Sequence, residues 1–477
     1  MTTVLLADRD GSALGPLGDR IVPALLPLES RLVLERMLEA LDSSGVRSAL
    51  LVVGPRAGQI ERRFGKGIRW GIALEYVRRE EGESVADVLK RLEHRLDGDT
   101  LVLRGDVGAH GAVGEFLEKA AGVEKAVVAA VAAVAAVAAV PGVPGGPGAP
   151  GGPAASAFRP VGFWKVRAGA LKTFAPPREP SAPDWVCDAT HATLLLEGEV
   201  PLLDSVESFR AADRAASPSV AERATADPKA LGPGTTVAEE SVVLAGAALK
   251  ETSVLPRTVI PSGVSLENVV VMGNAVVDTA TGSSSLLSDR LPAPAPRLPE
   301  AADRLAGIAL LVLSVPLWPV AFVWGLVANA GHATRAVTLN ANAPGADASG
   351  RPLRAPLRTF VFETAVPILR DLPLVLALAS GRLALTGVAP MPAADESALP
   401  DGWQKARLEA PVGLVAASRL FVPPSAPAEV PLLVDSFEAR RPSSGLLAAG
   451  LAALFGAKGW VAPKAWNPDD IRDRTEG

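Results

Sequence analysis

The side chains that most often bind metals or act as nucleophiles are scarce in this sequence. The one cysteine is Cys187, and the four histidines are widely spaced: His94, His110, His191 and His332. A structural zinc site needs four Cys or His ligands, mostly in closely spaced pairs, so we expect none here. A single cysteine also excludes an intrachain disulfide framework and suits a reducing compartment.

Charge and length narrow the class of protein. The formal net charge is -5, which gives no reason to expect a nucleic acid as partner. The 477 residues are enough for about three domains. Hydrophobic residues make up 48% of the chain. This fraction is high for a soluble protein and favours a membrane segment. The N-terminus lacks a basic region followed by a long apolar core, and we expect no signal peptide.

Short apolar runs alternate with helical patterns in residues 1–120. The strand-like runs lie at 3–6, 48–53, 73–77 and 100–103. This alternation predicts a mostly parallel sheet with helices on both faces. Residues 122–155 interrupt it with an Ala/Val tract and then a Pro/Gly tract, which we interpret as a flexible or extended connection.

Aliphatic residues recur almost every six positions between residues 231 and 280. They are Val237, Val243, Leu249, Leu255, Ile260 and Leu266. Such a short period predicts a β-helix, in which each turn stacks its aliphatic residues on the previous one. The alternative is an irregular β-rich linker. Residues 281–300 are rich in Ser and Pro and predict a linker.

Residues 305–328 carry no charge and are long enough to span a bilayer, for which about 20 residues are needed. Pro316 and Pro319 stand in the middle, and each removes a backbone donor and kinks a helix. We therefore predict a helix, a break and a second helix that re-enters the same leaflet, with Trp318 and Trp324 at interfacial depth. The alternative is a buried core helix.

Residues 1–215 resemble the nucleotidyltransferases that make nucleotide-diphosphate sugars. In that family the first strand leads into A-G-G-x-G-T-R-L-x-P-L and then P-K-P-L-L-P; here the stretches read ADRDGSALGPL, from Ala7, and VPALLP. The matching residues are Gly11, Leu14, Pro16, Leu17, Leu25, Leu26 and Pro27. The resemblance implies a Rossmann-like α/β domain.

The resemblance also implies a nucleotide site with a metal. Its nucleotide-binding residues would be Ala7, Gly11, Ser12, Gly82 and Asp106. Its Mg²⁺ ligands would be Asp106, which matches the aspartate of the family's Gly-Asp, and Asp204. Asp204 takes the place of the aspartate in a later family motif, D-x-G-T-P-E-x-[YF], only if two positions are deleted. Mg²⁺ is then the cofactor of an active enzyme. The alternative is that both aspartates merely cap turns.

The sequence departs from the family at the residues that handle phosphate. Two loop glycines are replaced by Asp8 and Arg9, the arginine that clamps pyrophosphate by Ala13, and the lysine of the second motif by Pro23. Losing one such charge-stabilising group costs ~10²–10³ in rate, so we expect little activity. Many enzymes of the family carry a left-handed β-helix. In that family the β-helix usually serves oligomerisation and in some members acyl transfer, for which a histidine is the usual base. Residues 231–280 contain no histidine. We therefore expect this stretch to be structural, and a homo-oligomer is one of the expected partners.

Residues 300–460 resemble the monotopic phosphoglycosyl transferases, which start glycan assembly on polyprenyl phosphate. Their active segment, D-E-L-P-x-L-x-N-V-L-x-G-x-[ML]-[SA]-L-V-G-P-R-P, matches residues 370–390 without gaps. The nucleophilic aspartate is replaced by Arg370 and its partner glutamate by Asp371. Arg370 would pair with Asp371 rather than activate it. A relocated nucleophile, Asp371, is the alternative. Further cations are lost at Val361, Glu363 and Ala389.

Together these patterns predict three parts. They are a nucleotidyltransferase-like α/β domain (1–215), a left-handed β-helix with a linker (216–296), and a membrane-associated, α-rich, sugar-transferase-like domain (297–477) with a re-entrant helix at 305–328. We expect the cytoplasmic face of a bacterial inner membrane. The expected partners are membrane lipid, a nucleotide-sugar or polyprenyl phosphate, and proteins of polysaccharide assembly.

Three hypotheses on function follow from this pattern. The first is a catalytically impaired scaffold or regulator of exopolysaccharide or glycan assembly. The second is an active, divergent sugar-phosphate transferase or sugar nucleotidyltransferase. The third is a sugar-nucleotide sensor.

Overall fold

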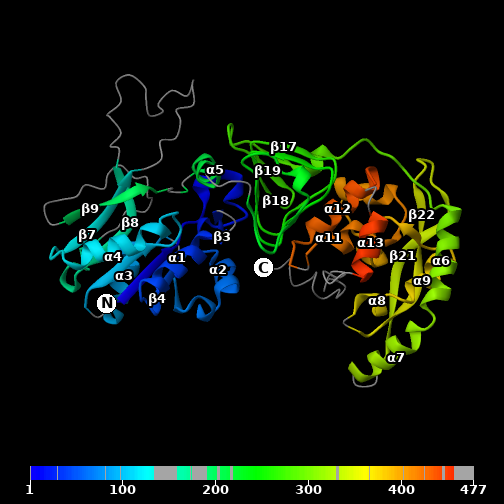
Figure 1. Ribbon diagram of the computed structural model, residues 1–477, viewed down its shortest axis with the longest axis horizontal. Helices are drawn as coiled ribbons and strands as arrows, with labels where there is room; N and C mark the ends of the chain where they lie inside the picture. Colours follow the sequence, from blue (N-terminus) through cyan, green and yellow to red (C-terminus); the bar gives the residue numbers. More distant parts are fainter. Residues whose placement is uncertain are drawn as a thin grey trace.

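A computed structural model gives the fold of the chain (Figure 1). It describes residues 2–455 except 29–30, 81, 97, 134–157, 172, 175–190, 201–202, 204, 215–218, 329–331, 365, 401, 424 and 443–445. Asp204 therefore lies outside the described residues.

A seven-stranded sheet forms the N-terminal part, in the order β5-β4-β1-β6-β8-β7-β9. The strands are β1 (Thr2–Ala7), β4 (Ser48–Val53), β5 (Ala73–Arg78), β6 (Thr100–Arg104), β7 (Val127–Ala133), β8 (Phe158–Val166) and β9 (His191–Glu199). The first four in sheet order pair in parallel, whereas β8 runs antiparallel to β6 and β7. The predicted parallel sheet is confirmed. A small hairpin, β2 (Pro27–Leu28) and β3 (Arg31–Leu32), follows the first loop.

Helices cover both faces of this sheet because its strand residues alternate between two apolar cores. One core joins Leu5, Leu51 and Leu103 to three helices, and the other joins Val4 and Val102 to one helix. The first three helices are α1 (Val33–Ser43), α2 (Ala57–Phe64) and α4 (Val113–Ala121), and the fourth is α3 (Val85–Leu92). The carboxyl ends of β1, β4 and β6 meet at one edge, where loops can bring functional side chains together.

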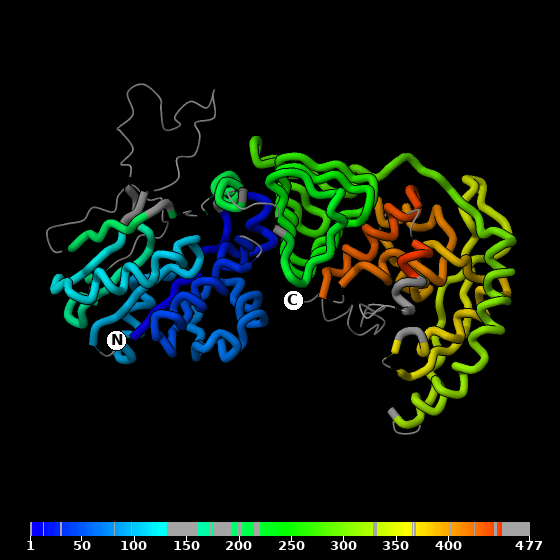
Figure 2. Tube along the Cα trace, viewed as in Figure 1, coloured from blue at the N-terminus to red at the C-terminus, as the bar shows by residue number. Residues whose placement is uncertain are grey.

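Parallel strand pairs form the middle of the chain, and they repeat every seventeen residues. Ser219 pairs with Thr236, and Thr236 pairs with Ser253. The three faces of the coil are β10 (Ser219–Val220), β12 (Thr236–Val237), β15 (Ser253–Val254) and β18 (Val269–Met272); β11 (Thr225–Ala226), β13 (Val242–Val243) and β16 (Val259–Ile260); and β14 (Ala248–Lys250) and β17 (Ser265–Glu267). The Cα trace shows the turns stacked on one another (Figure 2). Its left-handedness stays a prediction.

The coil ends in two antiparallel strands, β19 (Ala275–Asp278) and β20 (Ser284–Leu286). Its corners recur at the same place in successive turns. Glu240 and Arg257 both have positive φ, of 58° and 62°, and their side chains form an ion pair of 3.1 Å between turns. Regular pairing, rather than an irregular linker, therefore follows the N-terminal part.

The C-terminal part begins with two helices, α6 (Ala301–Ser314) and α7 (Leu317–Ala328). Among the described helices none is long and apolar enough to cross a bilayer by itself; α6 and α7 meet that test only as a pair, bent by 65°. The predicted break is present. The buried-core alternative is wrong, because Leu313 and Val327 are 74% and 81% exposed.

A long hairpin and several short elements complete this part. The hairpin is β21 (Thr334–Ala346) and β22 (Pro352–Phe362), and β23 (Ala384–Thr386) pairs with β24 (Gly413–Val415). The helices are α8 (Pro367–Arg370), α9 (Leu374–Ala379), α10 (Ala393–Ser397), α11 (Ala417–Phe421), α12 (Glu429–Arg440) and α13 (Leu446–Phe455).

The coil lies between the other two parts (Figure 1). It shares apolar clusters with both of them. Leu433 and Phe437 of α12 belong to the apolar core of the coil. On the other side, α5 (Val206–Arg214) docks on the coil, where Asp213 accepts hydrogen bonds from Thr236 and Ser253. The three parts are therefore joined by buried contacts.

The contact of α12 with the coil predicts that the two unfold together. Leu433→Ala should lower the free energy of unfolding by about 2–5 kcal/mol, as core truncations do. It should speed amide exchange both in the coil strands and in α12. Leu432→Ala, at a half-buried neighbour, is the matched control and should have a smaller effect. Faster exchange confined to α12 would contradict joint unfolding.

Candidate functional site

Two carboxylates meet at the carboxyl edge of the N-terminal sheet. Asp8 follows β1, and Asp106 follows β6 after Gly105. The chain after the neighbouring strand, β4, can pass close to Asp8 because it begins with Gly54. A Cβ added at Gly54 would lie 2.7 Å from the carbonyl oxygen of Asp8. The sheet therefore brings together residues that are far apart in the sequence.

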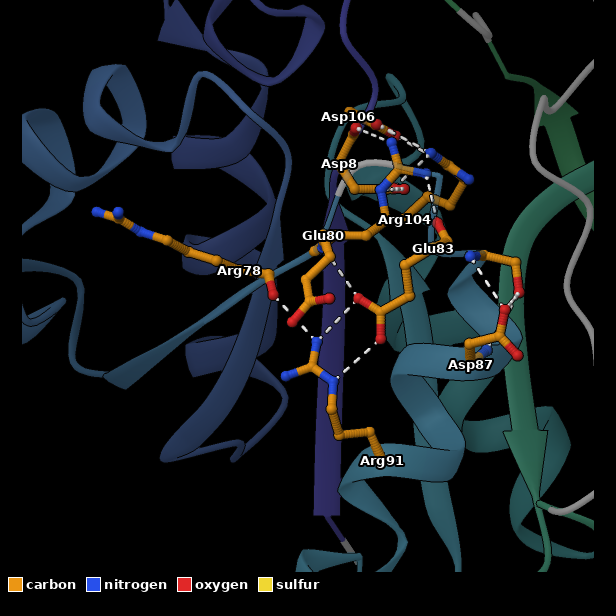
Figure 3. Close-up of polar contacts among 10 residues, drawn as sticks. Asp8, Arg78, Glu80, Glu83, Asp87, Arg91, Arg104 and Asp106 are labelled. Atoms are coloured by element: carbon orange, nitrogen blue, oxygen red, sulfur yellow. Dashed lines mark hydrogen bonds and ion pairs between the residues drawn. The ribbon is translucent and has the colours of Figure 1, made fainter.

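Arg104 lies between these carboxylates and binds both (Figure 3). Its Nε is 3.0 Å from Oδ1 of Asp106 and its Nη2 is 3.1 Å from Oδ2. The same Nη2 is 3.2 Å from Oδ1 of Asp8. These three side chains are between 1% and 3% exposed. Both oxygens of Asp106 thus accept hydrogen bonds from one guanidinium, away from water.

Two further arginines close the network around Asp8 and Asp106. The Nε of Arg79 is 3.3 Å from Oδ2 of Asp8. Arg9 donates to the backbone carbonyl oxygens of Asp106, at 3.3 Å, and Leu203, at 2.8 Å. From the sequence, Asp8 and Arg9 were replacements for loop glycines; in the structure their side chains turn inward and are bound.

The electrostatics of Asp106 decide whether Mg²⁺ fits here. Burial opposes ionisation, but Arg104 and Arg9 outweigh it, so the pKa of Asp106 lies below its usual range. The carboxylate is ionised, yet Arg104 holds both oxygens. In the described part of the chain, no group of three or more His, Cys, Asp or Glu side chains is placed to hold a metal ion. The residues do not fit the Mg²⁺ site predicted from Asp106.

The predicted nucleotide-binding residues take different places. Ala7 is buried at the end of β1, and Ser12 is exposed. Gly11 has φ of +85°, and an added Cβ would lie 3.2 Å from the carbonyl oxygen of Ile21, so glycine is needed there. Gly82 has φ of +81° and open space around it. Of these five residues, Asp106 is a member of the arginine network and Ala7 directly precedes another member, Asp8.

The loop after β1 packs on the coil. Leu14 and Leu17, in the 3-10 turn Ser12–Leu17, share an apolar cluster with Leu255 and Val270 of the coil. Arg20 then forms an ion pair of 2.8 Å with Glu429 at the start of α12. This packing fixes the loop that the family resemblance assigns to nucleotide binding.

A second carboxylate, Asp371, lies between α8 and α9 in the C-terminal part. The Nε of Arg370 is 2.9 Å from its Oδ1 and the Nη2 is 3.1 Å from its Oδ2. Arg419 of α11 also binds Oδ2. Burial opposes ionisation of Asp371, but Arg419 and Arg370 outweigh it and lower its pKa. The expected Arg370–Asp371 pair is present, and both oxygens are occupied.

A third buried network surrounds Arg407, which is fully buried. Its guanidinium binds Glu396, Asp435 and the carbonyl oxygen of Ala389. Ala389 stands where the phosphoglycosyl transferases have an arginine. A cation is therefore near this position after all, but it is bound to the carboxylates of the chain.

Sequence reasoning missed Arg79, Arg104 and Arg419. One signal was available for Arg104, which is the only charged residue of β6 and immediately precedes Gly105 and Asp106. An arginine in a buried strand needs a carboxylate partner. For Arg419 and Arg79 the sequence offers no comparable signal.

The ion pairs of Asp371 predict a pH-dependent stability. Asp371→Asn should destabilise the fold at pH 7 by about 3–5 kcal/mol, because it leaves buried arginines without their counter-ion. The lowered pKa means that the contribution of Asp371 is present above its ordinary value of 3.8 and is lost as the pH falls below it. Urea unfolding should show the difference shrinking from pH 7 to pH 3. Glu267→Gln, in the exposed pair with Lys250, is the control; a difference independent of pH would contradict the assignment.

The N-terminal part of the chain is similar to a known protein family. Residues 2–139 match the model of the nucleotidyl transferase family. A glucose-1-phosphate thymidylyltransferase of Actinoplanes sp. is 30% identical over 113 residues, which cover 23% of this chain and 37% of that relative. A solved structure assigned as a glucose-1-phosphate thymidylyltransferase from Bacillus anthracis, in complex with a sucrose, covers 45% of this chain and 94% of its own, with 16% identity and a TM-score of 0.35.

The match therefore spans little more than a third of the length of the curated relative. The family-model match, at residues 2–139, lies within the part of the chain that forms the seven-stranded sheet. The N-terminal region of this chain is a nucleotidyl transferase domain.

Proposed function

We propose that this protein is a membrane-associated, non-catalytic scaffold or regulator of bacterial exopolysaccharide or glycan assembly. One observation carries the proposal: at both candidate sites the remaining carboxylate is buried and bound through both oxygens by arginines of the chain. These carboxylates are Asp106 and Asp371.

In the N-terminal domain, nucleotidyl transfer would need positive charge directed at phosphate. Arg79 and Arg104 are instead directed at Asp8 and Asp106. The family's arginine and lysine positions hold Ala13 and Pro23. These two replacements support a domain that is kept for its shape.

In the C-terminal part, a nucleophilic carboxylate must present an oxygen to a sugar phosphate. The side chain of Asp371 is 8% exposed and is bound by Arg370 and Arg419. Attack would require both arginines to release it. One feature favours an active transferase as the second candidate function: the lowered pKa keeps Asp371 ionised, which is the nucleophilic form.

The bent helix pair supports association with lipid. Large apolar side chains of α7 face outward, among them Val320, Val323 and Val327. The bend is held by the indole N–H of Trp318, which donates to the hydroxyl of Ser314 at 3.1 Å. Trp318 also packs edge-on against Phe360 and Phe362 of β22. The protein would thus lie on the cytoplasmic face of the inner membrane and present its other surfaces to assembly proteins or to a second copy.

A transferase assay tests the scaffold. Membranes containing the wild type, with labelled UDP-sugar and undecaprenyl phosphate, should form no more lipid-linked product than membranes with Asp371→Ala. The physical reason is the occupied carboxylate. Membranes with an active phosphoglycosyl transferase serve as the positive control. Product that is formed by the wild type and lost in Asp371→Ala would establish the active transferase instead.

Membrane attachment is tested on α7. The wild type should stay in the pellet after carbonate extraction. Val320→Asp with Val323→Asp should move the chain to the supernatant, because each aspartate costs about 3 kcal/mol in a bilayer core. Leu353→Asp, at an exposed position of β22, is the control and should stay in the pellet. Wild-type protein in the supernatant would contradict membrane attachment.

A further inference from the structure

We infer that the guanidinium of Arg104 is a built-in cation that takes the place of a divalent metal ion beside Asp106, and so closes this site to metal-bound nucleotides. The inference rests on the proposed function. It adds the single residue that closes the site and a way to reopen it.

The contacts of Arg104 leave no carboxylate oxygen of Asp106 for another cation. Two parallel N–H···O bonds, of 3.0 and 3.1 Å, occupy Oδ1 and Oδ2. Nη2 reaches a second carboxylate, Asp8, at 3.2 Å. One planar cation thus joins two acidic side chains (Figure 3). A divalent ion with oxygen ligands would use these same atoms.

The fold makes room for this arginine. Gly162 of β8 has φ of +88°, and an added Cβ would lie 2.7 Å from Cγ and 2.9 Å from Cβ of Arg104. Any larger residue would collide with the aliphatic part of Arg104. The strand beside Arg104 therefore accommodates the arginine, which is 1% exposed.

Charge prevents a metal ion from entering while Arg104 is present. A dication would have to displace a buried cation, and Arg79 and Arg9 would remain close to the same carboxylates. Without Arg104, Asp106 would lose the guanidinium that binds both of its oxygens and would lie beside Asp8 in a region of low dielectric. Such a pair of hard oxygen ligands attracts Mg²⁺ or Mn²⁺.

Mn²⁺ titration of the full chain, followed by the electron paramagnetic resonance of the free ion, tests this inference. The wild type should leave Mn²⁺ free at millimolar concentrations. Arg104→Met, which keeps an unbranched apolar stem but removes the guanidinium and its charge, should bind Mn²⁺ at least about tenfold more tightly. Adding Asp106→Asn to Arg104→Met should abolish this binding.

Arg91→Met is the matched control, because Arg91 binds Glu83 on the surface of the same domain at 3.0 Å; it should behave as the wild type. A folded Arg104→Met that binds no more Mn²⁺ than Arg91→Met would overturn the inference. If Arg104→Met does not fold, the wild type decides: a bound Mn²⁺ overturns the inference and its absence supports it. Transferase activity of the wild type would contradict the proposed function, but it would not change these Mn²⁺ results.

Discussion

A carboxylate that is buried away from water needs a counter-ion, and much of the interior of this protein follows from that constraint. Asp106 is paired with Arg104, Asp371 with Arg370 and Arg419, and Asp435 with Arg407. In each case an arginine supplies several N–H donors in one plane, which suits a carboxylate better than a lysine would. The same pairing that stabilises the fold occupies oxygens of each of these carboxylates.

Asp435 shows that an arginine does not always outweigh the effect of burial on the pKa of a carboxylate. Burial raises the pKa of Asp435, and Arg407 offsets that rise only in part. At Asp106 and Asp371 the arginines outweigh burial and lower the pKa. The difference has a physical cause: Asp371 has two arginines and Asp106 is held bidentately, but Asp435 shares Arg407 with Glu396. Sharing one cation between two acids stabilises each of them less.

Much of the N-terminal fold could be predicted from the sequence, because apolar runs of strand length between helical patterns leave few alternatives. The turn at Gly54 and the position of Asp106 after a buried strand were also visible there. The partners of the carboxylates were not, since Asp8 and Arg104 are 96 positions apart and Asp371 and Arg419 are 48 apart. Contacts of that range depend on how the sheet and helices pack.

The helix break was predictable for a different reason, since proline acts on its own backbone. The start of α6 was not. The helix begins at Ala301, before the uncharged stretch, because Asp303 bonds back to the backbone N–H of Glu300 and caps the first turn. A charged residue ends an apolar run in the sequence, but it does not end a helix whose first turn faces water.

The seventeen-residue repeat of the coil has a consequence for how the protein can vary in length. In a free β-helical spacer, a whole turn could be inserted or deleted without harm to the pairing of the others. Here the ion pair between Arg20 and Glu429 joins the two outer parts directly, and Glu429 also accepts from the backbone of Asn274 at the end of the coil. An added turn would pull these groups apart. The number of turns is therefore fixed by the parts on either side, because the length of the coil sets the distance between them.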